Sequence, residues 1–441
     1  MKNAQVNNGF QTGNQEVTQG VVDQDYTFEK VPAKARKGFF AMFFIMLGFT
    51  FFSASMSVGA KLGIGLDLSG FLWSIIIGGI ILSVYTGLLA YIGSKTGLSF
   101  DLLARKSFGQ QGSKLASLFI GMTQIGWFGV GAAMFAVPAA DLLHISPVVL
   151  IALAGVCMTT SAYFGIRGME IISYISVPLI AGLGIYSMGL ALSEQGASAM
   201  FAQSSGNLSI FAGTGMVIGS FISGGTATPN FARFAKNTKI ATISTVVAFS
   251  IGNTLMFSFG AVGGAFTGRD DIFYVMIAQG LAVAALIVLG ANIWTTNDNA
   301  LYTGALGLSN ITGVRKRPMV LVAGLVGTVS ALWLYNNFIG WLSFLNATLP
   351  PVGGIIILDF FLHQDAYLDD QATQTERTIN YGAVAGVIIG ALVGNFVHVG
   401  VASLNAMFSA MVVYFAHDRL ANRLKLQRED ANAVPEYIYR K

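Results

Sequence analysis

The chain has 441 residues, of which 54% are hydrophobic and only 10% are charged, whereas ordinary soluble domains carry about 25% charged residues. The net charge of +4 does not indicate nucleic-acid binding, because the basic residues lie beside apolar runs. The single cysteine, Cys157, excludes an intrachain disulfide.

Apolar runs of about 20 residues recur along the chain, and each is long enough to cross a bilayer as a helix. We predict an all-α integral membrane protein with twelve transmembrane helices in a domain of residues 38–418. The spans are expected at about residues 39–60, 71–93, 115–139, 147–165, 171–192, 209–231, 240–263, 275–308, 318–335, 338–361, 380–399 and 401–417.

Two tails flank this domain, residues 1–37 and 419–441. The first 30 residues are polar and lack a signal-peptide pattern, so we expect a disordered leader. With the N-terminus inside, all of the 25 Lys and Arg residues except Lys61 and Arg269 lie on the inner side. This asymmetry predicts a multi-pass protein of the cell inner (cytoplasmic) membrane with both termini cytoplasmic.

Two spans carry small, hydroxyl-bearing and aromatic residues in their middle, at residues 47–55 of the first span and 219–226 of the sixth. Such residues make unwinding of a helix easy, and unwound backbone at membrane depth is tolerated where it lines a site. The two breaks are five spans apart, so their helices cross the membrane in opposite directions. The third and eighth spans stand in the same relation, and each has an amide shortly before a tryptophan. We therefore predict a five-plus-five inverted repeat, with repeat one at about 39–192, repeat two at about 209–361 and extra helices at about 380–417.

The most polar membrane stretch is residues 290–302, GANIWTTNDNALY, in the eighth span. At 100° per residue, one helix face holds four of its polar side chains, while Asn297 and Asp298 point elsewhere. These four are Asn292, Thr295, Thr296 and Asn299. Hydroxyls and amides at this depth suit a small polar ligand, a bare cation, or both.

Asp298 is the only acid deep in a predicted span. It could carry a proton in proton-coupled transport. Alternatively, it could cap backbone groups or pair with a basic residue near the inner face, such as Arg233. Its position off the polar face favours the structural role.

Two other classes of protein fit the sequence less well. An intramembrane enzyme would need paired acids or a His–Glu metal motif at membrane depth, and the four histidines show no HExxH spacing. We therefore predict that the protein is not an enzyme. A channel is disfavoured because broken helices beside an aromatic pair suit an occluding site better than an open pore.

Several motifs together resemble the cytosine permeases of the first nucleobase–cation symport family. They are TFFSASM at 50–56, LLARKSFG at 102–109, TQIGWFGVG at 123–131, GSFISGGT at 219–226, NIWTTNDNALY at 292–302, ALWLYNNFIGWL at 331–342 and PPVGG at 350–354. They cover spans one to ten in order. The resemblance implies a fold of the leucine-transporter type and a secondary active importer of cytosine, coupled to sodium by alternating access. The alternative is proton coupling, or another flat heterocycle such as uracil, a purine base or a hydantoin.

The resemblance also implies the site residues. The base would lie flat between Trp127 and Phe221, with Gln124, Ser220, Ser223 and Asn292 around its rim. Sodium would be held by backbone oxygens of Gly48 and Phe52 and by the eighth-span residues Asn292, Thr295 and Thr296. The expected partners are cytosine, sodium and the lipid bilayer, with no cofactor, nucleic acid or obligatory protein partner.

The residues themselves fit this chemistry. Stacking between two aromatic faces contributes roughly 1–3 kcal/mol per base and does not distinguish one base from another. Discrimination must come from the rim, where an amide can pair with an amine beside a ring nitrogen. Uracil inverts that pattern and would leave buried polar groups unpaired, at about 1–3 kcal/mol each.

Overall fold

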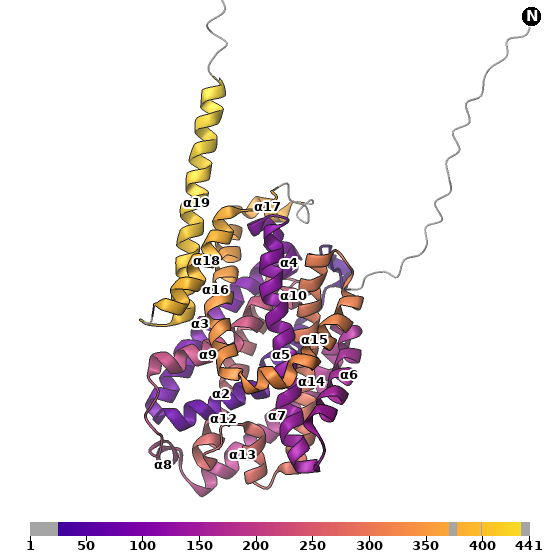
Figure 1. Cartoon of the computed structure of the whole chain (residues 1–441), viewed down its shortest axis with the longest axis vertical. Helices are drawn as coiled ribbons and strands as arrows, with labels where there is room; N and C mark the ends of the chain where they lie inside the picture. The colour runs from indigo at the N-terminus through magenta and orange to yellow at the C-terminus, as the bar shows by residue number, and fades with distance from the viewer. Residues whose placement is uncertain (1–24, 370–376, 398, 434–441) are drawn as a thin grey trace, which may run out of the picture.

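The structure is a computed structural model that describes residues 25–369, 377–397 and 399–433. Within these residues the elements are helices, which form one elongated bundle (Figure 1). In chain order they are η1 (Ala33–Ala35), α1 (Phe39–Thr50), α2 (Ser53–Gly65), α3 (Leu68–Thr96), α4 (Phe100–Phe108), α5 (Gly112–Leu143), α6 (Pro147–Tyr163), α7 (Ile166–Glu194), α8 (Ala197–Phe201), α9 (Ile210–Ala227), α10 (Pro229–Ala232), α11 (Thr238–Val247), η2 (Ala248–Gly252), α12 (Asn253–Thr267), α13 (Ile272–Ala278), α14 (Ala282–Thr312), α15 (Lys316–Asn336), α16 (Phe338–Leu362), α17 (Gln364–Leu368), α18 (Tyr381–Phe396) and α19 (Ala402–Ala433).

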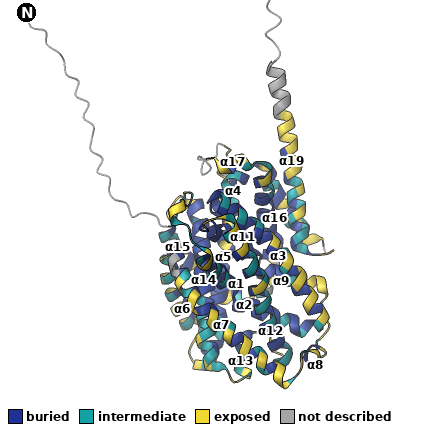
Figure 2. Ribbon diagram, turned by 180° about the vertical axis from the view of Figure 1, so that it is seen from behind, coloured by how far each residue is buried: buried dark blue, intermediate teal, exposed yellow. Residues whose placement is uncertain are grey.

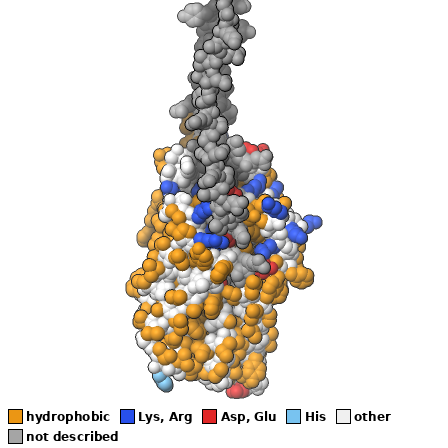
Figure 3. All heavy atoms as spheres, turned by 90° about the vertical axis from the view of Figure 1, so that its right-hand side faces the viewer, with side chains coloured by type: hydrophobic (Ala, Val, Ile, Leu, Met, Phe, Trp, Pro, Cys, Tyr) orange, Lys and Arg blue, Asp and Glu red, His pale blue; other side chains and the backbone are white. Residues whose placement is uncertain are grey.

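The helical, membrane-spanning character predicted from the sequence is confirmed. Within the described residues, six helices are long and apolar enough to cross a membrane singly, and the bent pair α1 and α2 adds a seventh; shorter apolar helices accompany them. Large apolar side chains face outward, including Ile80 at 60% and Val329 at 79% exposure. Figure 3 shows hydrophobic side chains over most of the visible face, with Lys and Arg gathered toward one end. Such a surface suits lipid rather than water.

The first span is interrupted, as predicted. α1 ends at Thr50, α2 begins at Ser53, and the two axes are bent by 49°. Phe51 and Phe52 lie between them, and Phe52 is extended. The break leaves backbone groups of both residues outside any helix ladder, so other partners must satisfy them.

The predicted interruption of the sixth span at residues 219–226 is wrong. α9 continues through this stretch to Ala227, and the one-turn helix α10 follows. A Cβ added to Gly224 would lie 2.5 Å from the Phe221 ring and 2.9 Å from the Phe49 ring. Gly224 therefore leaves room for the Phe49 ring of α1, and α9 stays helical through these small residues.

The predicted eighth span, 275–308, is divided between α13 and α14. α14 packs along α5, α15, α7 and α6, and its residues from Thr295 to Gly307 are all buried. Figure 2 shows buried residues through the interior of the bundle and exposed ones at its periphery. A polar helix in this central position must place its side chains against other helices on every side.

Residues 25–37, which we name the N-terminal segment, pack against the bundle although the sequence predicts a tail of residues 1–37. The fully buried Arg233 guanidinium donates hydrogen bonds to the backbone oxygens of Asp25 at 2.8 Å and Tyr26 at 2.9 Å, and to the Tyr302 hydroxyl at 3.1 Å. The Asp25 carboxylate pairs with Lys316 Nζ at 2.8 Å, and the two side chains are 8% and 1% exposed. Residues 1–24 and 434–441 of the predicted tails lie outside the described residues.

The N-terminal segment also contacts other elements. Val31 N donates to Gly97 O at 3.0 Å at the end of α3, and Lys37 forms a parallel β-bridge with Ala235 after α10. Lys37 pairs with Glu170 of α7 as well. The segment thus joins α3, α7, α10 and the start of α15 at one end of the bundle. We call this the basic end, and the end that carries α8 and α13 the opposite end (Figure 1).

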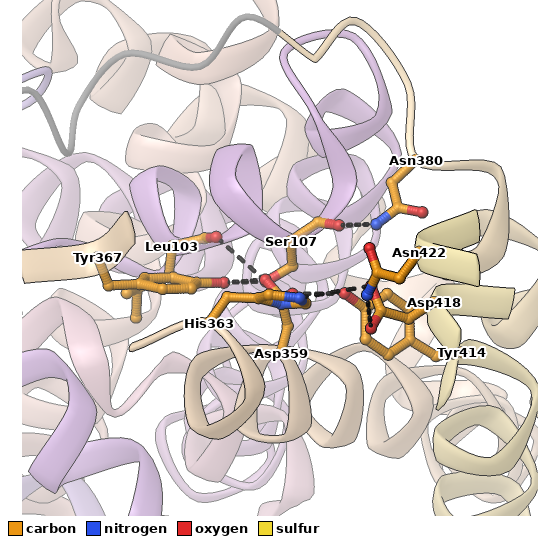
Figure 4. Close-up of polar contacts among 9 residues, drawn as sticks. All are labelled: Leu103, Ser107, Asp359, His363, Tyr367, Asn380, Tyr414, Asp418 and Asn422. Carbon is orange, nitrogen blue, oxygen red and sulfur yellow. Dashed lines mark hydrogen bonds and ion pairs between the residues drawn. The ribbon is translucent and has the colours of Figure 1, made fainter. Parts of the chain in front are cut away.

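A polar cluster around Asp359 connects α16, α17 and α19 to α4 at the basic end (Figure 4). Asp359 accepts hydrogen bonds from the hydroxyls of Tyr367 and Tyr414, and His363 Nδ1 lies 2.8 Å from Asp359 Oδ1. The Tyr367 hydroxyl also lies 2.7 Å from Ser107 Oγ on α4. We name these five residues the Asp359 cluster. It gives the last helices of the chain a fixed attachment to the rest of the bundle.

Candidate functional site

A cavity lies where the α1–α2 break meets α5, α9 and α14, and we name it the central chamber. It measures about 20 Å³, whereas an apolar cavity that takes up benzene in another protein measures about 150 Å³. A six-membered ring therefore fits only after the walls move apart. The lining residues are Phe49, Phe52, Gln124, Trp127, Ser220, Phe221, Gly224, Thr296, Asn297 and Ala300.

The two predicted aromatic walls both line this chamber. The Trp127 ring of α5 lies edge-on to Phe52, with centroids 5.6 Å apart, and to Phe338, with centroids 5.9 Å apart. The Phe221 ring of α9 lies edge-on to Phe49 at 5.3 Å. Both side chains are almost fully buried. Aromatic side chains thus enclose the chamber on the sides of the break, α5 and α9.

The three predicted rim residues on α5 and α9 all have defined hydrogen-bond partners. Gln124 Nε2 donates to Ser223 Oγ at 2.6 Å, and Ser223 in turn donates to Thr123 Oγ1 at 3.1 Å. Ser220 donates to Val217 O of its own helix at 2.9 Å. Gln124 and Ser220 line the chamber, whereas Ser223 does not and instead fixes the orientation of Gln124.

Asn292 lies apart from the chamber and spans the α1–α2 break. Its Nδ2 donates to Phe51 O at 2.5 Å, and its Oδ1 accepts from Ser53 N at 3.0 Å. The carboxamide therefore replaces hydrogen bonds that a continuous helix backbone would supply, because it satisfies one backbone acceptor and one backbone donor across the break. In this arrangement neither polar atom of the side chain is directed at a ligand in the chamber.

Backbone and hydroxyl oxygens gather beside the break, and we name them the oxygen cage. Thr296 Oγ1 lies 3.5 Å from Gly48 O, 3.4 Å from Phe51 O and 3.4 Å from Asn292 O. The backbone oxygen beside Thr296 Oγ1 is that of Phe51, whereas the sequence analysis expected that of Phe52. Phe52 O instead accepts from Ser55 N in the first turn of α2. The bend places the last carbonyls of α1, rather than the first of α2, against α14.

The hydroxyl of Thr295 lies at the edge of the oxygen cage. It is 2.5 Å from Ser176 Oγ on α7 and also donates to Ala291 O at 3.1 Å. Ser173, one turn earlier on α7, has a buried Oγ without a hydrogen-bond partner among the described residues. A Cβ added to Gly48 would lie 2.4 Å from that Oγ. Glycine at this position therefore lets α1 approach α7 closely enough to complete the cage.

Asn297 lines the chamber, although the sequence analysis directed it away from the site. Its Nδ2 donates to Phe128 O at 3.0 Å, whereas its buried Oδ1 has no hydrogen-bond partner among the described residues. A buried acceptor without a partner is uncommon and marks a place for a donor. The sequence signal that could have identified Asn297 was the polar run of residues 290–302 itself. When a helix is buried on all sides, a side chain on any of its faces can face a site.

Asp298 points away from the chamber. Its Oδ1 accepts from Ser161 Oγ of α6 at 2.6 Å, and the same hydroxyl accepts from Trp294 Nε1 at 2.6 Å. The suggested pairing with Arg233 is wrong, because that guanidinium binds the N-terminal segment. Asp298 thus connects α14 to α6, and its Oδ2 has no hydrogen-bond partner among the described residues.

Known proteins resemble this chain along most of its length. A family model described as a permease for cytosine/purines, uracil, thiamine and allantoin matches residues 30–416. The chain is 47% identical over 420 residues to the cytosine permease of Escherichia coli strain K12, covering 93% of this chain and 99% of that protein. A purine-uracil permease of Arabidopsis thaliana is 25% identical over 352 residues, or 66% of this chain and 55% of that protein.

Solved structures share the fold. Mhp1, a nucleobase-cation-symport-1 family transporter in a closed conformation with bromovinylhydantoin bound, matches with a TM-score of 0.77 at 18% identity, covering 90% of this chain and 95% of that one. A Na⁺-coupled sialic acid symporter matches with a TM-score of 0.69 at 16% identity, covering 90% and 93%. The sequence relatives are permeases, which agrees with the prediction of a transporter rather than an enzyme. The chain therefore belongs to the family of permeases for cytosine and purines, uracil, thiamine and allantoin.

Proposed function

We propose that the protein is a secondary active transporter that imports cytosine together with sodium by alternating access. One observation carries the proposal: aromatic and amide side chains of α5, α9 and α14 surround the central chamber directly beside the oxygen cage. The 47% identity to a cytosine permease supports cytosine as the substrate.

The membrane arrangement is part of the same proposal. The chain crosses the inner membrane twelve times, as a five-plus-five inverted repeat of residues 39–192 and 209–361 followed by two extra helices. The basic end faces the cytoplasm with both termini, because Lys and Arg are retained on that side. The interruption of the first span and the amide–tryptophan pairs of α5 and α14 support this arrangement.

The base is held by stacking on its two faces and by hydrogen bonds along its edge. After the chamber widens, the ring lies between Trp127 and Phe221, and Asn297 Oδ1 accepts a hydrogen bond from the exocyclic amine. Gln124, oriented by Ser223, serves the neighbouring edge. Uracil would present a carbonyl to Asn297, and two facing acceptors would cost about 1–3 kcal/mol. The support for this assignment is the buried Asn297 Oδ1, for which the described residues supply no hydrogen-bond donor.

Sodium occupies the oxygen cage and couples its own binding to that of the base. Na⁺ is a hard cation and prefers neutral and anionic oxygens, and the cage offers the carbonyls of Gly48, Phe51 and Asn292 with the hydroxyls of Thr295 and Thr296. Bound sodium draws the end of α1 toward α14. Phe52 follows Phe51 in the chain and lines the central chamber, so this movement also changes the shape of the base site.

The experiment that tests the proposal is uptake of radiolabelled cytosine into proteoliposomes with and without an inward sodium gradient. We expect sodium-stimulated, saturable uptake that excess uracil, adenine or hydantoin inhibits less than cytosine does. Thr296→Val should remove the sodium stimulation, whereas Thr312→Val, on the exposed end of the same helix, should retain it. Stimulation by a proton gradient alone, or equal behaviour of the two variants, would refute the sodium assignment.

Proton coupling is the second candidate, and a single observation favours it. Asp298 is a fully buried carboxyl, one residue from a chamber-lining amide, and one of its oxygens has no hydrogen-bond partner within the described part of the chain. If a proton is the driving ion, Asp298→Asn should abolish the response of uptake to pH and leave base binding in place. If the ion dependence of uptake is unchanged in that variant, the role that remains for Asp298 is its structural connection of α14 to α6.

A further inference from the structure

A second cavity lies at the opposite end of the bundle, and we name it the outer cavity. It measures about 220 Å³, which exceeds the roughly 150 Å³ that accommodates benzene elsewhere. Its walls come from α2, α5, α15, the start of α16 and the residues just before α13. The lining includes Lys61, Asp270, Asp271, Tyr335 and Phe338.

The outer cavity adjoins the central chamber through one pair of rings. Phe338 lines the outer cavity, and its ring lies 5.9 Å from that of Trp127, at an interplanar angle of 75°. Trp127 in turn lines the central chamber. A ligand passing between the two spaces at this point would displace this pair. The Phe338–Trp127 ring pair therefore lies between the lining of the outer cavity and that of the central chamber.

One carboxyl oxygen in the outer cavity is weakly satisfied. Asp271 Oδ1 accepts from Phe273 N at 2.9 Å and caps α13, but Oδ2 accepts from the Tyr335 hydroxyl at 3.4 Å. Hydroxyl donors normally approach within about 2.5–3.0 Å, so an N–H group could replace this contact. Burial raises the pKa of Asp271 to about 6, and the carboxylate still accepts hydrogen bonds at neutral pH.

The other charges at the cavity oppose each other. Lys61 Nζ pairs with Asp270 at 2.6 Å near the surface, and an ammonium has three donors, so Lys61 can also meet a carbonyl. This ion pair neutralises Asp270 and leaves the Asp271 carboxylate as an acceptor for an N–H donor. A large anion would face two carboxylates. The rings of Tyr335 and Phe338 instead offer apolar faces to a flat, uncharged molecule.

We propose that the outer cavity is a second, weaker binding site for the transported class of ligand, a planar uncharged heterocycle with an amine or ring N–H beside a carbonyl. The ligand stacks on Tyr335 or Phe338, donates its N–H to Asp271 and accepts from Lys61. It then enters the chamber when Phe338 leaves Trp127. This inference rests on the proposed function, which supplies both the ligand class and the outward orientation of this end.

Equilibrium binding of radiolabelled cytosine to the full chain in detergent tests the proposal. The wild type should bind two molecules per chain, one tightly and one weakly. Trp127→Ala should remove the tight site and retain the weak one. Adding Asp271→Asn, which keeps an acceptor for the α13 cap, should weaken the remaining site about tenfold, the usual loss for a charged hydrogen bond. Adding Tyr335→Ala should weaken it as well.

Asp141 provides a matched control, because it accepts from Tyr274 at the same end and does not line the outer cavity. Asp141→Asn should leave the weak site unchanged. Equal effects of the Asp271 and Asp141 substitutions, or loss of all binding in Trp127→Ala, would overturn the second site. A wild type that transports cytosine but binds one molecule per chain would overturn it while the proposed function stands. A wild type that neither binds nor transports cytosine would overturn both.

Discussion

Replacing Asn292 by alanine should destabilise the protein more than any loss of packing explains. The substitution leaves Phe51 O without its 2.5 Å hydrogen bond and Ser53 N without its 3.0 Å hydrogen bond. Both residues are at most 3% exposed, so water does not reach these groups in the intact fold. An unpaired buried polar group costs about 1–3 kcal/mol. The expected loss is therefore about 2–6 kcal/mol for the two groups, toward the lower value because Thr296 Oγ1 still lies 3.4 Å from Phe51 O.

Denaturant unfolding in detergent micelles, followed by tryptophan fluorescence, measures this loss. Asn395→Ala is the matched control, because Asn395 is exposed on α18 and bonds only to its own helix; exposed substitutions usually change stability by less than about 0.5 kcal/mol. Asn292→Asp should retain the contact to Ser53 and lose the donor to Phe51, so its stability should remain below that of the wild type. Equal stability of Asn292→Ala and Asn395→Ala would refute the assignment of this side chain as the bridge across the break.

Three further outcomes are expected. Asn297→Ala should weaken cytosine binding about three- to tenfold, the worth of one neutral hydrogen bond, in equilibrium binding assays with the purified protein. Lys316→Met should remove the buried ion pair with Asp25, at about 3–5 kcal/mol, and limited trypsin digestion should then cut within residues 30–37. His363→Gln should change the pH dependence of thermal stability: the hydrogen bond with Asp359 raises the pKa of His363 above 6.5, so the wild-type advantage should be greatest below pH 6.5 and fade as the pH rises through the raised value.

Further variants and measurements test the same three contacts. Gly131 faces Asn297 Oδ1, and Gly131→Ala should also weaken binding because its Cβ would lie 2.4 Å from that oxygen. Lys61→Met breaks a more exposed ion pair at the opposite end and should not open the N-terminal segment to trypsin. For His363, Asp418 at 3.5 Å adds to the raised pKa and Arg377 opposes it. The pKa of histidine in the unfolded chain is ~6.5. If the stability difference between the wild type and His363→Gln is the same at every pH from 5.5 to 8.5, the role of the charged imidazole is contradicted.

Hydropathy and local composition predicted the membrane character, the helices and the interruption of the first span, because these follow from the length and apolarity of each run. They predicted the sixth span wrongly. Glycine and serine are compatible both with unwinding and with close helix packing, and only the neighbouring Phe49 shows that packing is the role of Gly224. Similarly, the angle of the α1–α2 bend determines whether the carbonyl of Phe51 or that of Phe52 lies beside Thr296.

Long-range contacts could not be predicted from the chain alone. The assignment of one polar face to α14 assumed a helix with a single partner, but α14 has neighbours on every side, so Asn297 was missed. The polar composition of residues 25–37 is typical of a loose leader. Its order depends on Arg233 and Lys316, which lie more than 200 residues away in sequence, and no local pattern reports such distant partners.

The N-terminal segment has a consequence for the direction of transport. It contacts α3 and α10 on one side and the start of α15 on the other, so any rocking that separates these helices at the basic end must first release it. A contact made in only one of two conformations shifts their populations by its own free energy. In the proposed orientation, with the basic end toward the cytoplasm, the strength of this tether is expected to set how often the carrier opens on that side, and a tag or truncation near residue 25 should change its turnover without touching the substrate site.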